Sequence, residues 1–228
     1  MAAPSYVSSS IGGVTTNTIS VLAPSSVVSG NLLLAVASCD ASFFTGTVTT
    51  GASEFTVPSG WTQFGFTFST VTTHHLPLAV YYKFASASEP GTYDFTCKNN
   101  YLSVAILQYS GVTSTSPLDV KAFAGHNTSS GDFPSVTTSV ADERLVFGIT
   151  TYTGVTTSST VATLRAQAAL SPDRSLAVLD KTQASAGSSG TVPFSLSSGC
   201  PYKMFTIGIK PPSSRGRPAT FFPLFVSR

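Results

Sequence analysis

Few residues in this sequence are suited to metal binding or acid–base catalysis. The chain has ten acidic residues and three histidines. His74 and His75 are adjacent, and adjacent side chains of an extended strand point to opposite faces, so the two cannot readily share a metal ion. His126 stands alone in a stretch rich in Ser and Gly, whereas a zinc site needs several His or Cys ligands at short spacing. We therefore expect no metal site.

Motifs that hold a nucleophile or a phosphate are missing from the sequence. The string nearest to a nucleophile elbow, Gly187-Ser188-Ser189-Gly190, does not have the Gly-x-Ser-x-Gly spacing. No glycine-rich loop is followed by Lys-Ser or Lys-Thr, as phosphate binding would require. We therefore expect that the chain is not an enzyme, with no catalytic residue and no cofactor.

Carboxylate pairs remain open at this stage, because two acids far apart in the chain can meet in the fold. Asp142-Glu143 precedes a strand-like run and is interpreted as a solvated turn. Asp94 falls on the polar face of its strand, where Lys83 or Lys98 can pair with it.

Trp61 is the single tryptophan, and it follows Val57-Pro58-Ser59-Gly60. Two interpretations stay open for it. A tryptophan near a turn can stack its apolar face on a sugar ring, or it can anchor a loop over the core. Core packing is favoured, and glycan contact is the alternative.

Hydroxyl side chains replace charged ones in this composition. Of 228 residues, 42% are hydrophobic and only 10% are charged, while 36 are Ser and 31 are Thr. The apolar fraction excludes a disordered chain. A net charge of +2 argues against nucleic-acid binding, and no apolar run is long enough to span a bilayer, so we expect neither partner. The first residues lack the pattern of a secretory signal, so we expect synthesis in the cytoplasm.

Three cysteines, Cys39, Cys97 and Cys200, are widely spaced and odd in number. Cys39 and Cys97 fall in apolar, strand-like runs. These features favour buried free thiols over a disulfide framework.

Period-two alternation of apolar and polar residues dominates the chain and predicts strands. Residues 78–84 and 92–98 alternate clearly, and the Pro90-Gly91 pair between them predicts a hairpin or a tight strand connection. Residues 31–39 are apolar on both faces, as in a covered central strand. Residues 161–170 have a helical composition but alternate, so they are predicted to be a strand.

Together these segments predict an all-β fold, an antiparallel β-sandwich that is jelly-roll-like, over residues 1–211 as one domain. Further predicted strands cover 103–109, 143–150, 175–180 and 204–210. No internal repeat of fixed period is visible in the sequence.

Residues 212–228 differ from the rest and are predicted to form an extended C-terminal arm. The arm has three arginines and no acid, so it carries +3, whereas the body, with nine basic and ten acidic residues, carries −1. Its prolines disfavour a helix or a central strand. Its apolar residues would be a liability on a free monomer and indicate a contact with a partner. The predicted partner-binding residues are Arg215, Arg217, Phe221, Phe222, Leu224 and Phe225.

Several segments in order resemble a family of β-sandwich modules found in tailed-bacteriophage virion proteins and in some bacterial surface proteins. The resemblance is carried by Gly30–Val36, Pro58–Thr62, Tyr81–Ala85, Glu89–Thr96, Ala105–Val112, Pro117–Asp119 and Phe205–Pro211. The arm after Pro211 is not part of that module.

This resemblance implies a structural or adhesive virion part. Our first hypothesis is a head decoration (cement) protein on the capsid surface. It would form a homo-oligomer, a dimer or trimer, and would bridge neighbouring major capsid subunits. The alternative is a tail or fibre receptor-binding module that recognises host surface glycan through Trp61.

Overall fold

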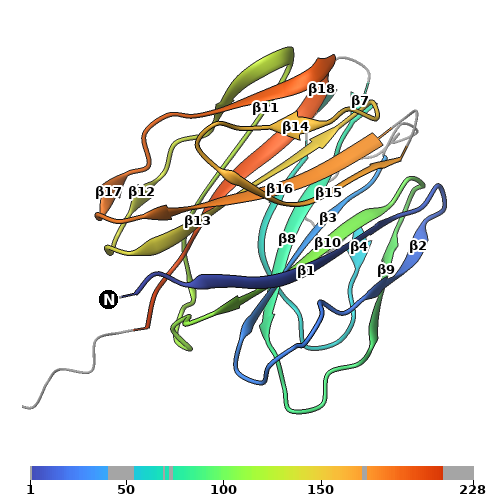
Figure 1. Ribbon diagram of the computed structural model, residues 1–228. Coiled ribbons are helices and arrows are strands. Elements are labelled where there is room, and N and C mark those ends of the chain that lie inside the picture. Colours follow the sequence, from blue (N-terminus) through green and yellow to red (C-terminus); the bar gives the residue numbers. More distant parts are fainter. Residues whose placement is uncertain (1, 41–53, 69, 72–73, 171–173, 213–228) are drawn as a thin grey trace, which may run out of the picture.

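The protein is described here by a computed structural model covering residues 2–40, 54–68, 70–71, 74–170 and 174–212. All regular structure in these residues is β-strand, and every strand pair is antiparallel. The all-β sandwich architecture expected from the alternation is confirmed (Figure 1).

Strands from the first half of the chain form a large sheet, here called the N-terminal sheet, and a smaller outer sheet. In spatial order, the N-terminal sheet contains β1 (Ser5–Gly13), β10 (Ser103–Ser110), β3 (Leu32–Ser38), β8 (Leu78–Phe84) and β5 (Thr62–Thr67). The outer sheet contains β2 (Thr18–Leu22), β9 (Thr92–Cys97) and β4 (Phe55–Thr56). The short strands β6 (Thr70–Val71) and β7 (His74–His75) pair with each other.

Strands from the second half form the C-terminal sheet and a cover over its far face. In spatial order, this sheet contains β11 (Leu118–Phe133), β18 (Val192–Ile209), β13 (Glu143–Thr151), β16 (Arg174–Gln183) and β15 (Thr163–Leu170). The short strand β14 (Thr157–Ser158) pairs with β18, and β12 (Thr137–Thr138) pairs with β17 (Gly187–Ser188). Residues 163–170 are thus a strand, as their alternation predicted.

Three apolar cores separate these layers. One lies between the outer and N-terminal sheets, one between the N-terminal and C-terminal sheets, and one behind the C-terminal sheet. Both large sheets are therefore covered on both faces, which demands apolar residues at odd and even positions alike. All seven residues of β3 are buried in the centre of its sheet, as predicted.

The connection from β8 to β9 is not a hairpin. β8 pairs with β3 and β5, whereas β9 pairs with β2 and β4, so the chain crosses from one sheet to the other between them. Glu89 holds this connection: it accepts hydrogen bonds from Lys83 at 2.8 Å, from Tyr93 at 2.5 Å and from the backbone N–H of Ser86 at 2.6 Å. Gly91, which the turn prediction relied on, does not have a positive φ.

The two halves repeat one strand order. We number the eight main strands of each half from its start and leave out β6 and β7. In both large sheets the spatial order of the strands is then first, eighth, third, sixth and fifth. The second strand also pairs with the seventh in each half, as β2 with β9 and β12 with β17. The sequence did not predict this repeat, because no fixed period is visible in it.

Short sequence segments recur at equivalent places in the two halves. Leu78–Lys83 and Leu176–Lys181 share Leu-Ala-Val at their start and Lys at their end. Residues 85–92 and 184–191 both begin Ala-Ser-Ala and end Gly-Thr. In each half, the shared lysine binds a residue of the connection that follows its strand. Lys83 binds Glu89, and Lys181 donates to the carbonyl of Ser189 at 3.1 Å. The halves are thus two versions of one unit.

The two large sheets face each other in opposite strand order. Ser9 of β1 donates to the carbonyl of Arg165 in β15 at 2.9 Å, and Ser38 of β3 donates to Thr150 of β13 at 2.7 Å. At the other edge, Lys121 of β11 donates to the carbonyl of Phe64 in β5. The first strand of each sheet therefore faces the fifth strand of the other, so an approximate two-fold axis relates the halves.

A buried carboxylate joins the two sheets. Asp180 of β16 is fully buried and accepts from Arg165 at 2.9 Å and from the hydroxyl of Tyr109, across the interface in β10, at 3.2 Å. Arg144 lies 3.7 Å away and also donates to the carbonyl of Pro4 at 2.8 Å. The Arg165 guanidinium in turn stacks on the ring of Tyr6, at 4.4 Å. A paired, hydrogen-bonded charge of this kind is tolerated inside a protein, but an unpaired one is not.

Replacing Asp180 with Asn is expected to lower the free energy of unfolding by about 3 kcal/mol, because two partly buried arginines lose their counter-charge. Urea denaturation at neutral pH measures this loss. The exposed Asp132 supplies the matched control, and Asp132→Asn is expected to change stability by less than about 0.5 kcal/mol. Equal effects of the two substitutions would contradict the role given to Asp180.

Candidate functional site

The residues predicted to bind a partner lie outside the described residues. They are Arg215, Arg217, Phe221, Phe222, Leu224 and Phe225. The structure does describe the point at which the chain enters this segment, here called the arm root, formed by Lys210–Pro212 and the residues that hold them.

The arm root is fixed to the connection between the two halves. Lys210 follows the last residue of β18, and its N–H donates to the carbonyl of Pro117 at 2.8 Å. The N–H of Thr113 donates back to the carbonyl of Lys210 at 3.2 Å. The Lys210 ammonium lies 3.8 Å from the carboxylate of Asp119. A recess of about 320 Å³ opens here, lined by Thr113, Ser114, Thr115, Val140, Lys210, Pro211 and Pro212.

Two carboxyl groups meet beneath the arm root. Glu143, the first residue of β13, is fully buried beside Asp119 in β11, so its interpretation as part of a solvated turn is wrong. A Cβ on Gly208 of β18 would lie 2.2 Å from Oε2 of Glu143, so only glycine fits opposite this carboxyl group. A glycine inside the apolar run 204–209 is the sequence signal that could have revealed this close approach.

Burial and the neighbouring charge set the protonation of this pair. Burial raises the pKa of Glu143 to about 8, and the hydrogen bond to Asp119 and the charge of Asp119 act in the same direction. Burial alone would raise the pKa of Asp119. Hydrogen bonds from Glu143 and from Ser139, whose N–H and hydroxyl both donate at 2.7 Å, outweigh this effect, so the pKa of Asp119 is lowered. At neutral pH the pair thus holds one proton, on Glu143, and Asp119 remains available to Lys210.

Trp61 lies in the core between the outer and N-terminal sheets. The residue is 9% exposed, and its ring makes edge contacts with Tyr93 at 5.5 Å and Phe95 at 6.0 Å between ring centroids. Stacking on a pyranose needs a free ring face, and Trp61 does not present one. The core interpretation fits this position, and the glycan contact assigned to Trp61 does not.

The structure also tests the predictions made for the cysteines and for Asp94. Cys39, Cys97 and Cys200 are free and buried, as predicted. Asp94 accepts from the hydroxyl of Ser20 at 2.5 Å. The lysines expected to pair with Asp94 have other partners, because Lys83 pairs with Glu89 and Lys98 lies 3.7 Å from Glu54.

The three histidines lie on two strands of the fold. His74 and His75 form β7, and His126 lies in β11 with its ring against Tyr202. In the part of the chain that the structure describes, no group of three His, Cys, Asp or Glu side chains is placed to hold a metal ion.

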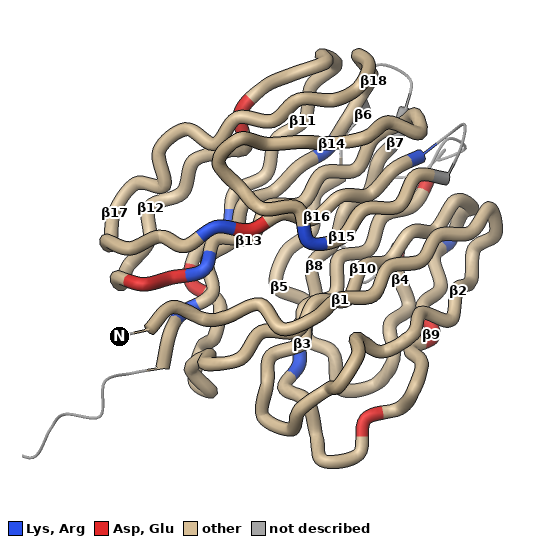
Figure 2. Tube along the Cα trace, viewed as in Figure 1, with Lys and Arg blue, Asp and Glu red and all other residues tan. Residues whose placement is uncertain are grey.

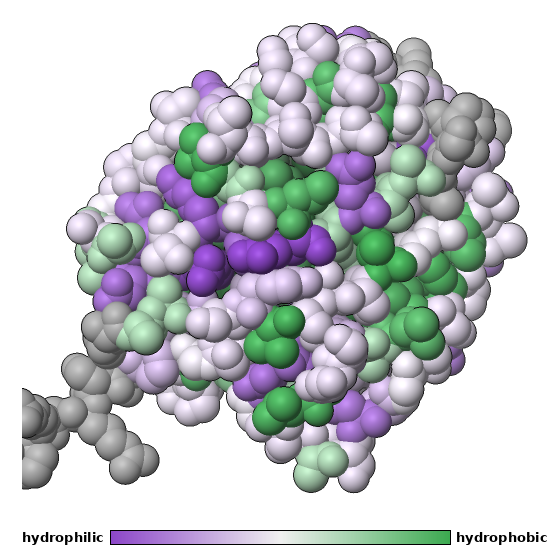
Figure 3. Space-filling view, viewed as in Figure 1, coloured by the Kyte–Doolittle hydropathy of each residue, from purple (hydrophilic) through white to green (hydrophobic). Residues whose placement is uncertain are grey.

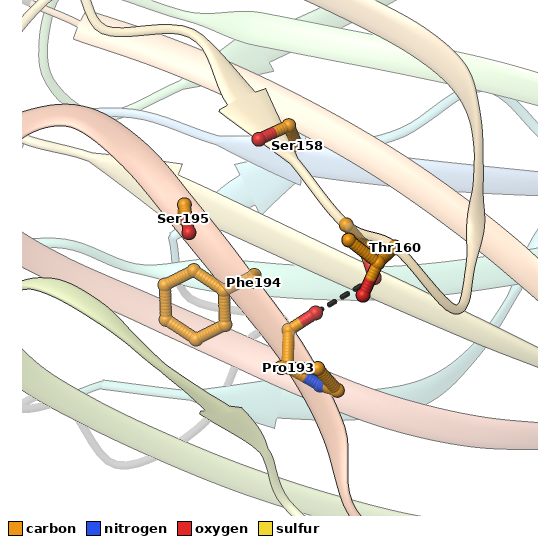
Figure 4. A pocket seen from close by; sticks show the side chains of 6 residues that line it. Ser158, Thr160, Pro193, Phe194 and Ser195 are labelled. Atoms are coloured by element: carbon orange, nitrogen blue, oxygen red, sulfur yellow. Dashed lines mark hydrogen bonds between the residues drawn. The ribbon is translucent and has the colours of Figure 1, made fainter.

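Hydroxyl side chains contribute to the lining of the recesses found on the described part of the body. One recess, of about 130 Å³, is lined by Ser158, Ser159, Thr160, Pro193, Phe194 and Ser195. Figure 4 shows it from close by. Within it, the hydroxyl of Ser159 donates to the carbonyl of Pro193 at 2.7 Å. This recess has no titratable side chain in its lining, so it offers hydrogen bonds but no acid–base chemistry.

A larger groove, of about 560 Å³, runs between β1 and β2. It is lined by Ser9, Ser10, Ile11, Gly12, Ser20, Val21, Leu22, Ala23 and Ser25. Leu22 is 68% exposed and is among the most exposed large apolar residues of the described chain. Both hydroxyl and apolar groups thus line this groove.

Charged residues are sparse along the chain (Figure 2), and weakly polar side chains cover much of the face in Figure 3. Many of the charges are used within the body. Ion pairs join Lys83 to Glu89, Lys98 to Glu54, Arg174 to Asp40, Lys210 to Asp119, and Arg144 and Arg165 to Asp180.

Comparison with known proteins adds no relative: no family model, no curated protein and no solved structure matches this chain. Within the described residues there is also no helix with the length and hydropathy needed to cross a bilayer.

Glu143→Gln is expected to make the protein less sensitive to alkaline pH. Between pH 4.5 and about 8, the folded chain keeps the proton on Glu143, whereas the unfolded chain has released it. The stability that this group contributes is therefore fully present below pH 4.5 and is lost as pH rises through about 8. The glutamine can donate the same hydrogen bond to Asp119 without ionising. The unfolding free energy of the variant, relative to wild type, should therefore rise between these two pH values.

Glu89→Gln is the matched control for that titration. Burial of Glu89 is outweighed by hydrogen bonds from Lys83, Tyr93 and Ser86, which lower its pKa to about 2. Its contribution is therefore present above pH 4.5 and lost as pH falls through about 2. This variant should be less stable than wild type at neutral pH. A parallel pH dependence of wild type and Glu143→Gln would contradict the shared proton.

Trp61→Ala is expected to lower the free energy of unfolding by about 3 kcal/mol, because it leaves a cavity against Tyr93 and Phe95. Denaturation followed by circular dichroism measures the loss. An alanine variant as stable as wild type would place the indole outside the core and restore the glycan hypothesis.

Proposed function

We propose that the protein is a head decoration (cement) protein of a tailed bacteriophage. In this proposal it binds the outer surface of the capsid as a homo-oligomer and joins neighbouring major capsid subunits. The class is suggested by the family resemblance of segments that occur in order along the chain, from Gly30–Val36 to Phe205–Pro211.

The observation that carries the proposal is the use of charge in the body. Many charged side chains are engaged in ion pairs within the fold, and hydroxyl groups contribute to the lining of the outer recesses. Docking such a surface on another protein desolvates few unpaired charges, and desolvation of charge is the main cost of burying polar surface. A broad, lattice-like contact is therefore favourable for this body.

The C-terminal arm supports the proposal through its composition and its starting point. Residues 213–228 contain three arginines, no acid and four large apolar residues in the stretch 221–225. The arm root holds the chain at Lys210 by backbone hydrogen bonds to the connection between the halves. A cationic, aromatic segment that starts from a fixed point suits capture by an acidic, grooved neighbour.

Stabilisation of the shell would follow from mass action. A protein that binds only the assembled lattice stabilises it by about 2.7 kcal/mol when its free concentration is a hundred times Kd. No catalytic step is needed. We do not propose the glycan-binding alternative, because the ring assigned to it, Trp61, is buried.

Binding to capsid shells that lack the protein tests the proposal. Wild-type protein should cosediment with such shells to saturation and raise the temperature at which they disrupt. Replacing Phe221, Phe222, Leu224 and Phe225 with Ser should weaken binding at least tenfold, about 1.4 kcal/mol.

Val161 and Leu164, exposed apolar residues of the body, supply the matched control, and replacing both with Ser should leave binding within about twofold, under 0.5 kcal/mol. Failure of wild-type protein to bind any shell would overturn the proposal. Equal binding by the arm variant and wild type would remove the arm from the mechanism.

A further inference from the structure

We propose that the C-terminal arm of the free protein docks on its own body, with its apolar residues 221–225 in the groove between β1 and β2. The groove is then an interaction surface, and its partner is a segment of the same chain. The inference concerns the protein in solution and does not depend on the proposed function. In that function, the capsid competes with this groove for the arm.

The groove combines apolar surface with unpaired strand edges. Within the described residues, β1 pairs only with β10 and β2 only with β9, so one edge of each strand has no backbone partner there. An edge of this kind is a template for pairing with another extended segment. The apolar residues that line the groove between these edges are Ile11, Val21, Leu22 and Ala23.

Several hydroxyl groups of the groove are already used within the body. Ser9 donates to a backbone carbonyl of β15, and Ser20 donates to a carboxylate of β9. Ser10 donates to the carbonyl of Leu22 at 2.5 Å. None of the nine described residues that line the groove is charged. A ligand of this groove is therefore held by apolar contact and by backbone hydrogen bonds, not by charge.

Exposed apolar side chains lie around this groove. Leu22 in its lining, Val7 of β1 and Val28 in the loop after β2 are among the exposed large apolar residues of the described chain. The hydroxyl of Ser8 donates to the carbonyl of Ser25 at 2.8 Å, which holds that loop against β1. Figure 3, viewed as in Figure 1 with β1 toward the viewer, shows apolar side chains on this face. Exposed apolar groups that gather in one place indicate a contact with a partner.

The arm begins beside the start of β1. Arg144 pairs with Ile209, the last residue of β18, and its guanidinium donates at 2.8 Å to the carbonyl of Pro4, directly before β1. The arm root, Lys210–Pro212, follows Ile209 directly. The span of one arginine residue therefore links the arm root to the start of the strand that lines the groove (Figure 1).

The length of the arm matches the distance to the groove. The groove is lined by β1 from Ser9 to Gly12, and a strand advances about 3.4 Å per residue, so it lies roughly 17 to 27 Å along β1 from Pro4. Phe221 is nine residues beyond Pro212, and nine extended residues span up to about 30 Å. Residues 221–225 can therefore reach the groove of their own chain.

The composition of the arm fits this site. Residues 221–226 are apolar and uncharged, like the groove. Pro218 and Pro223 suit an edge position, because an edge strand is paired on one side only. Docking removes both the apolar residues of the arm and the exposed Leu22 from water. A segment tethered this closely has an effective concentration in the millimolar range, which favours its own groove over that of a second copy.

Limited digestion of the full chain with chymotrypsin, without capsid shells, tests this docking. The protease can cut the arm after Phe221, Leu224 and Phe225, and intact mass spectrometry separates these cuts from cuts in the body. Cleavage of a docked segment follows the population of its open form, so docking should slow these cuts. The protection should not change on tenfold dilution, because the contact is intramolecular.

Two double variants distinguish the groove from the rest of the surface. Replacing Val7 and Leu22 with Ser should make cleavage of the arm at least about fivefold faster, because the groove loses its exposed apolar contacts. Val161 and Leu164 are exposed to a similar degree but do not line the groove, and replacing both with Ser should leave the rate within about twofold. Both variants should keep the unfolding temperature of wild type, since the replaced side chains are exposed.

Hydrogen exchange observes the groove itself. Backbone amides in residues 9–12 and 20–25 should exchange faster in an arm variant with Ser in place of Phe221, Phe222, Leu224 and Phe225. Unchanged exchange in these segments would overturn the proposal. So would equal rates of arm cleavage in wild type and the groove variant. Protection that is lost on dilution, together with the mass of a dimer, would also overturn it, because the groove would then hold the arm of a second copy.

Discussion

The contact between the two large sheets is the interaction on which the rest of the structure depends. β3 illustrates the constraint, since Leu33 and Leu34 point to opposite faces and are both fully buried. Each half therefore needs the other half to cover its inner face. The same contact supplies the hydroxyl of Tyr109 to Asp180 and brings Tyr6 onto Arg165. This contact therefore places the charge of Asp180 in the interior. Hydroxyl groups form much of the outer surface.

Much of the fold could be predicted from local sequence. Alternation located β8, β9 and β15, and the continuous apolar run 31–39 located a central strand, because the side-chain period of a strand is set by the backbone alone. The sheet to which each strand belongs could not be read in this way. Pro90-Gly91 predicts a turn, but whether β9 pairs with β8 or crosses to another sheet depends on distant partners. The repeat was hidden because only short segments survive in both halves, at Leu78–Lys83 and Leu176–Lys181.

The site was less predictable than the fold. The arm was chosen on composition, and its residues lie outside the described part of the chain. Glu143 was assigned to solvent because it follows Asp142 in a polar stretch, yet the strand that begins there carries it under β18 beside Asp119. Pairing of two carboxyl groups 24 residues apart requires the register of β11, β18 and β13, which no local pattern contains.

Electron cryomicroscopy of tailed-phage particles assembled in the presence of this protein tests the proposed capsid role. We expect density for the two stacked halves on the outer shell, in hundreds of copies, each across a boundary between neighbouring capsid subunits, with the arm root facing the shell. Density confined to the tail in a handful of copies, or particles without bound protein, would contradict this role.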